Sequence, residues 1–155
     1  MARIMLVDDD RNVLRSLGRT IHFMPFAQLR GEAVVESFEK PTLALARAAE
    51  CEFDLVIADY LMPTMTGVDF MHKFTELHPH TPRILLSGFA GILEAMAMVK
   101  GMGPIELVAK PWEDEQLKQI IARLLQSNRS HKTTALASPR RMPQASPLQM
   151  TAARF

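Results

Sequence analysis

Acidic side chains, a serine and a lysine stand at the ends of separate apolar runs of this chain. Oxygen ligands with no His or Cys nearby favour a hard cation such as Mg²⁺. A carboxylate beside such a cation can attack a phosphoryl group whose oxygens a lysine and a hydroxyl neutralise. The candidate residues are Asp8, Asp9 and Asp59 for the metal, Asp59 also as the nucleophile, and Ser87 and Lys110 for the phosphoryl oxygens.

The elements that must position these residues can be predicted from the apolar pattern. The run Leu55–Ala58 has no polar alternation, which is typical of a strand buried on both faces in a parallel sheet. Strands are expected at 3–7, 33–38, 54–60, 83–87 and 105–109, and helices within 13–24, 41–51, 70–77, 92–102 and 113–125, with 25–32 as an irregular connection. Five βα units predict an α/β fold, a doubly wound five-stranded parallel sheet with helices on both faces. The candidate side chains then share the carboxyl edge of the sheet.

Length and cysteine content limit the class of protein. The chain of 155 residues suits one domain with a full core. Cys51 is the only cysteine, so an internal disulfide is impossible and a reducing compartment is natural. The N-terminus lacks a signal-peptide core, and no run is long enough to span a membrane. We expect a cytoplasmic protein without membrane association.

Charge and composition change after residue 127. Residues 1–127 hold 13 basic and 17 acidic residues, whereas residues 128–155 hold five basic residues and no acid. The second segment is rich in Ser, Pro and Ala and lacks apolar periodicity, so it buries too little surface to fold alone. We expect one domain at 1–127 and a flexible basic tail at 128–155. The tail is a poor candidate for nucleic-acid binding, because its charges are dispersed and lack aromatic neighbours.

Four motifs in order resemble the receiver domain of a two-component response regulator, of the stand-alone CheY-like kind. The motifs are Leu6–Asp10, Asp54–Pro63 with Gly67, Leu85–Gly88 and Lys110–Trp112. The resemblance covers about 127 residues and implies a flavodoxin-like sheet with strand order 2-1-3-4-5. It implies that a sensor histidine kinase or histidine phosphotransfer protein phosphorylates Asp59.

The resemblance also implies roles for the other site residues. Asp9, Asp59 and the carbonyl of Leu61 would bind Mg²⁺ directly, Asp8 would help through water, and Ser87 and Lys110 would hold the phosphoryl oxygens. The Lys110–Pro111 bond would be cis. Such a protein is not an enzyme beyond its own phosphorylation and dephosphorylation. It would reach a downstream effector through residues 92–126, with phosphorylation-dependent dimerisation as a further possibility.

Three positions depart from the commonest pattern of this family. Leu107 stands where relatives carry an aromatic switch, and a leucine has no ring to rotate between exposed and buried positions. Leu61 and Phe89 stand two residues beyond Asp59 and Ser87, where family side chains flank the path of the hydrolytic water. Apolar groups at both positions predict a long-lived phosphoryl group.

Two other functions would use parts of the same pattern. Asp8 and Asp10 have the Asp-x-Asp spacing of aspartate-nucleophile phosphatases, but Arg11 and Asn12 follow where a threonine would be expected, and the chain lacks room for a cap domain. A phosphorylation-independent interaction module on the same fold is the second alternative. Leu107 favours it mildly, whereas the complete acidic set, Ser87 and Lys110 argue against it.

Overall fold

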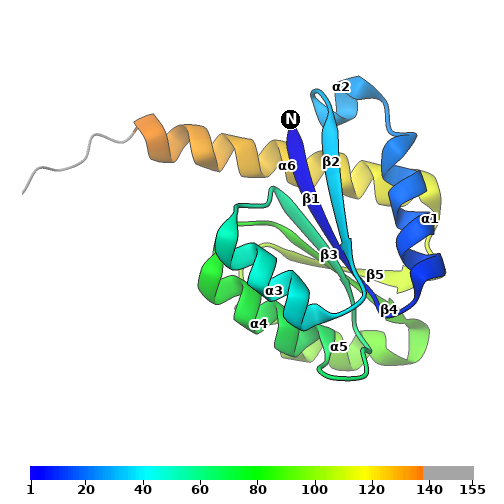
Figure 1. The fold of residues 1–155 in the computed structure, drawn as a ribbon. Helices are drawn as coiled ribbons and strands as arrows, with labels where there is room; N and C mark the ends of the chain where they lie inside the picture. The colour runs from blue at the N-terminus through cyan, green and yellow to red at the C-terminus, as the bar shows by residue number, and fades with distance from the viewer. Residues whose placement is uncertain (138–155) are drawn as a thin grey trace, which may run out of the picture.

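A five-stranded parallel sheet forms the centre of the protein, in a computed structural model that describes residues 1–137 (Figure 1). The strands lie in the order β2-β1-β3-β4-β5, and all neighbouring pairs are parallel. This confirms the predicted fold class and strand order. The strands are β1 (Ala2–Val7), β2 (Ala33–Phe38), β3 (Leu55–Asp59), β4 (Arg83–Gly88) and β5 (Ile105–Lys110).

Helices cover both faces of the sheet (Figure 1). The first two and the last cover one face, and the other three helices cover the opposite face; a short 3₁₀ turn precedes the second-last helix. The helices are α1 (Arg11–His22), α2 (Phe26–Leu29), α3 (Pro41–Glu50), α4 (Gly67–Leu77), α5 (Ile92–Met98) and α6 (Asp114–Ala137), and the 3₁₀ turn is η1 (Phe89–Gly91).

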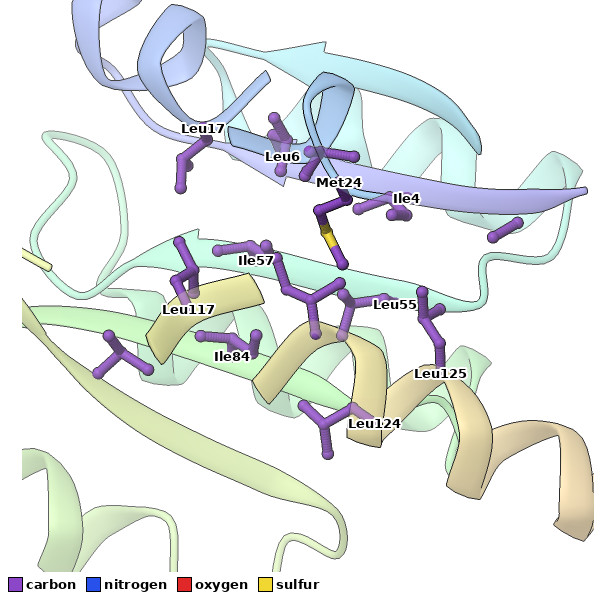
Figure 2. Packing of buried hydrophobic residues seen from close by; sticks show 14 of the residues in the cluster. Ile4, Leu6, Leu17, Met24, Leu55, Ile57, Ile84, Leu117, Leu124 and Leu125 are labelled. Carbon is purple, nitrogen blue, oxygen red and sulfur yellow. The ribbon is translucent and has the colours of Figure 1, made fainter. Parts of the chain in front are cut away.

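Two hydrophobic clusters form because successive strand residues point to opposite faces of the sheet. Ile4 and Leu6 of β1 pack toward α1 and α6, whereas Met5 and Val7 pack toward α3 and α4. Figure 2 shows the first cluster, in which the β1 and β3 side chains meet leucines of α6. All residues of β3 are buried, as its uninterrupted apolar sequence predicts.

Helix starts agree with their local sequence signals. The Asp10 carboxylate accepts a hydrogen bond from the Asn12 backbone N–H at 2.8 Å, so Asp10 is the N-cap of α1. Thr66 and Asp69 form a reciprocal capping box at the start of α4. These caps fix where α1 and α4 begin relative to the strands that precede them.

Two segments differ from the sequence prediction. The connection predicted to be irregular contains the four-residue helix α2, which ends at Arg30 in the left-handed conformation. Helix α5 ends at Met98 rather than near residue 102. Gly101 and Gly103 have positive φ in the turn that follows, a conformation that does not continue a helix.

The prediction of a flexible tail from residue 128 is wrong for residues 128–137, which continue α6. Asn128 is buried, and its side-chain amide donates to the Asp54 carbonyl at 3.2 Å. Lys132 lies 3.1 Å from the Asp54 carboxylate. Polar contacts with the loop before β3 therefore hold residues 128–137 in a helix, although these residues have no apolar periodicity that would predict one. Residues 138–155 lie outside the described part of the chain.

Arg83 is a fully buried cation at the start of β4. Its guanidinium donates to the Thr75 hydroxyl and to the Met102 carbonyl, and within residues 1–137 it forms no ion pair. Burial lowers the pKa of Arg83. The Arg83 guanidinium thus links α4 to the turn before β5 through hydrogen bonds alone.

None of the helices in residues 1–137 combines the length and the apolar character that a membrane crossing requires.

Asn128→Ala is expected to lower the free energy of unfolding by about 1–2 kcal/mol, because the partly buried Asp54 carbonyl loses its side-chain donor. Urea unfolding measures the loss, and hydrogen exchange should show faster exchange in residues 129–137. Ser127→Ala is the matched control, since Ser127 is exposed on the same helix. Equal stability of the two variants would contradict the role of Asn128.

Candidate functional site

The topology brings the predicted site residues to one edge of the sheet. Asp8 follows β1 directly, Asp59 ends β3, and Lys110 ends β5. Ser87 lies at the end of β4, where it is paired in register with Ala109 beside Lys110. Four separate segments of the sequence therefore meet at the carboxyl end of the central strands.

Lys110 connects two of the acidic residues. Its Nζ lies 2.7 Å from Asp59 Oδ1 and 3.1 Å from Asp8 Oδ2. Burial lowers the pKa of Lys110, but hydrogen bonds with Asp59 and Asp8 outweigh it, so the pKa is raised overall. The ammonium therefore stays charged and holds the two carboxylates close together.

Asp8 is the most deeply buried acid of the site, with 1% of its surface exposed. Its carboxylate also accepts a hydrogen bond from the Asp10 backbone N–H at 2.9 Å. Burial raises the pKa of Asp8, and the contacts with the Asp10 N–H and Lys110 do not fully compensate. The ionised form of Asp8 is therefore less favourable than that of a solvent-exposed aspartate.

Asp8, Asp9 and Asp59 form a group that could hold a metal ion. One carboxylate oxygen from each lies within 4.8 Å of the others, and Asp9 is exposed to solvent. The donor set is all oxygen, which suits a hard divalent cation. The three carboxylates carry more negative charge than the single ammonium of Lys110 can neutralise. A bound divalent cation would reduce their mutual repulsion.

Ser87 is buried, but its hydroxyl is not directed at the acids. Ser87 Oγ donates to the carbonyl of Gly88 at 3.0 Å. The hydroxyl would have to give up that bond to bind a phosphoryl oxygen.

Gly67 closes the loop that follows Asp59. Its N–H donates to the Tyr60 carbonyl at 2.7 Å, and a Cβ at Gly67 would overlap the Asp59 carbonyl oxygen. Only glycine fits this close approach. The first residue of α4 is therefore packed directly on the backbone of the predicted phosphoacceptor.

The atypical positions lie around the site. Leu61 is 69% exposed and Phe89 is 89% exposed, so neither side chain covers Asp59 in this conformation. Leu107 is half-buried against the α3–α4–α5 cluster. The Lys110–Pro111 peptide bond is cis, which confirms the expectation drawn from the family resemblance.

Sequence reasoning missed two residues that contact the site. The Asp10 backbone N–H binds Asp8, and Gly91 of η1 lies against Ser87. The adjacent Asp-Asp-Asp sequence offered a signal for the first contact. Nothing in the sequence indicated the second, because it depends on how η1 folds back over β4.

Comparisons with known proteins agree with this geometry. The family model of the response regulator receiver domain matches residues 4–122. The chain is 30% identical over 146 residues to the C4-dicarboxylate transport transcriptional regulatory protein DctD of Rhizobium meliloti (strain 1021), covering 90% of this chain and 30% of that protein. It is 31% identical over 124 residues to the response regulator protein FleR of Pseudomonas aeruginosa, covering 79% of this chain and 24% of FleR.

A solved structure shows the same arrangement. The signal receiver domain of an HD domain-containing protein from Pseudomonas fluorescens Pf-5 superposes with a TM-score of 0.74 at 28% identity, covering 85% of this chain and 92% of that one. The chain spans less than a third of the length of DctD and FleR, which are both longer regulators. The family match, with this fold, shows that the chain belongs to the response regulator receiver domains of two-component systems.

Proposed function

We propose that this receiver domain accepts a phosphoryl group on Asp59 from a phosphohistidine of a sensor histidine kinase or histidine phosphotransfer protein. The observation that carries the proposal is the contact of the Asp59 carboxylate with Lys110 at 2.7 Å, beside Asp8 and Asp9. An acid held next to an ammonium and two further acids is arranged for phosphoryl chemistry. The reaction belongs to the cytoplasm, where kinases draw on ATP.

In the proposed step, a carboxylate oxygen of Asp59 attacks the phosphorus of the donor. The phosphorus–nitrogen bond breaks, the imidazole leaves and takes up a proton, and Asp59 becomes an acyl phosphate. Lys110 already contacts Asp59 Oδ1 and can pass to a phosphoryl oxygen with little movement. Ser87 would turn from the Gly88 carbonyl to a second phosphoryl oxygen. The protein acts only on itself and in this sense is not an enzyme.

The residues present fit Mg²⁺. Asp8, Asp9 and Asp59, together with the backbone carbonyl of Leu61, would hold the ion, which would neutralise phosphoryl charge when bound. Burial raises the pKa of Asp8, and a cation beside this carboxylate would favour its charged form. Asp8 and Asp9 therefore serve to bind and orient, whereas Asp59 carries the phosphoryl group.

Phosphorylation replaces the single negative charge of the Asp59 carboxylate with an acyl phosphate that carries roughly 1.5 to 2 negative charges. A change of a few kcal/mol in the free-energy difference between two conformations of a segment is enough to change which of them predominates. We propose that residues 92–126 change as a result and bind a downstream effector, or a second copy of the phosphorylated chain. DctD and FleR are named as regulators, and their greater length leaves room for effector domains.

Two other functions would use parts of the same site. A phosphorylation-independent interaction module is favoured by Leu107, which has no ring to switch. Partner affinity that stays unchanged on phosphorylation would support it. A phosphatase built on Asp8 and Asp10 is disfavoured, because the Asp10 side chain caps α1 and lies outside the acidic group.

Incubation with acetyl phosphate and Mg²⁺ is expected to add one phosphoryl mass to the wild-type protein. Intact-mass spectrometry measures the adduct, which should require Mg²⁺ and be absent from Asp59→Asn, because that variant lacks the nucleophile. Lys110→Met should reduce the yield strongly. A wild-type protein that forms no adduct would reject the proposed function.

The adduct should decay slowly, because Leu61 and Phe89 give the hydrolytic water no polar partner. Combined Leu61→Asn and Phe89→Asn substitutions are expected to shorten its half-life several-fold, measured by the same mass method after removal of acetyl phosphate. Both side chains are exposed, so the folded structure should tolerate the changes. Unchanged decay would show that the apolar side chains at these two positions do not slow hydrolysis of the phosphoryl group.

Asp8→Asn is expected to stabilise the metal-free protein at neutral pH. The pKa of Asp8 is raised above its ordinary value of 3.8 in the folded state, so its stability contribution is present below pH 3.8 and is lost as the pH rises through the raised value. In EDTA at pH 7 the Tm should rise by a few degrees, and the gain should shrink toward pH 4. Glu76→Gln, on the exposed side of α4, is the control. A lower Tm for Asp8→Asn would contradict this charge balance.

A further inference from the structure

Tyr60 lies between the predicted phosphoacceptor and α5. It follows Asp59 directly, and its backbone is held on both sides: its N–H donates to the Leu86 carbonyl and its carbonyl accepts from the Gly67 N–H, each at 2.7 Å. The side chain is 6% exposed and belongs to the cluster that also contains Ala95 of α5. The ring is therefore anchored to the strand of Asp59 and packed beneath a helix on the surface.

Gly91 brings the backbone of η1 against two side chains of this region. A Cβ at Gly91 would lie 2.7 Å from Ser87 Oγ and 3.1 Å from two ring carbons of Tyr60. The Ser87 hydroxyl also donates to the carbonyl of Gly88, the residue that precedes η1. The start of the η1–α5 segment thus rests on Ser87 and Tyr60 together.

Helix α5 buries little of its own surface. Of its seven residues only Ala95 is buried, and Leu93 and Met96 are exposed. Glu94, three residues after Gly91, lies close to the Tyr60 phenol: burial and then this carboxylate raise the pKa of Tyr60. A short helix with so little buried surface has low local stability. The contacts with Tyr60, together with those with β4 and β5, therefore hold α5 in place.

We propose that Tyr60 couples the phosphorylation state of Asp59 to the position of η1 and α5, an inference that rests on the proposed function. Ser87 gives up the Gly88 carbonyl when it turns to a phosphoryl oxygen, and the segment loses one of its two supports at Gly91. The contact with Tyr60 remains and determines how far the helix moves. Such a shift needs only a modest difference in contacts between the two positions.

This coupling gives the ring of Tyr60 a role that Leu107 cannot fill. Leu107 packs half-buried against the same cluster from β5. Its branched aliphatic side chain has no hydroxyl to meet Glu94. Tyr60 offers both a ring under Gly91 and a polar end near α5.

Hydrogen exchange of residues 89–98, with and without acetyl phosphate and Mg²⁺, tests the coupling in the full chain. In the wild type, phosphorylation is expected to speed exchange by about threefold or more. Tyr60→Leu, which removes the ring beneath Gly91, should exchange faster already when unmodified and should lose most of the further change. Glu94→Gln should also exchange faster than the wild type in residues 89–98, but by a smaller factor than Tyr60→Leu. Glu76→Gln on α4 should behave as the wild type.

Intact mass recorded on the same samples separates the two claims. Full adduct formation together with a wild-type exchange response in both Tyr60→Leu and Glu94→Gln would overturn the coupling and leave the proposed function standing. No adduct in the wild type would overturn both. Because Glu94 is exposed, its variant should fold normally, so the test holds even if Tyr60→Leu is unstable.

Discussion

The contact of Lys110 with Asp59 and Asp8 is the interaction on which the rest of the site depends. Three carboxylates at one sheet edge repel each other, and the ammonium is the cation that the chain itself supplies there. Its placement requires β5 to lie beside β4 and to extend beyond Val108, the residue that is level with Asp59 in the sheet. The parallel order of the strands is thus a condition for the charge balance, and the hydrophobic clusters on both faces hold that order.

The same edge combines rigid and loosely held parts. Gly67 packs on the Asp59 backbone with no space for a side chain, and Thr66 with Asp69 fixes the start of α4. On the other side, α5 is short and mostly exposed. The start of α4 is therefore held more firmly at this edge than α5 is. If Asp59 is phosphorylated as proposed, we expect α5 to move more readily than α4, with the core unchanged.

The sequence predicted the strands and the residues at their ends well, because buried parallel strands are uninterrupted apolar runs and topology then places their ends together. Helix 128–137 was missed, since Asn128 and Lys132 hold it through polar contacts with Asp54 that leave no periodic pattern. The end of α5 depended on Gly101 and Gly103 in left-handed conformations. The Lys110 distances, the hydroxyl bond of Ser87 and the packing of Gly91 depend on tertiary structure and could not be predicted from spacing.

Arg83 has a consequence for how the protein responds to heat. The guanidinium is fully buried and is held by a hydroxyl and a carbonyl without a carboxylate partner among residues 1–137. The hydration of a charged group becomes less favourable as temperature rises, so the cost of removing it from water falls. The penalty for burying Arg83 is therefore largest in the cold and smallest near the unfolding temperature. This cation should flatten the stability curve of the domain, so that warming removes less stability than its apolar core alone would suggest.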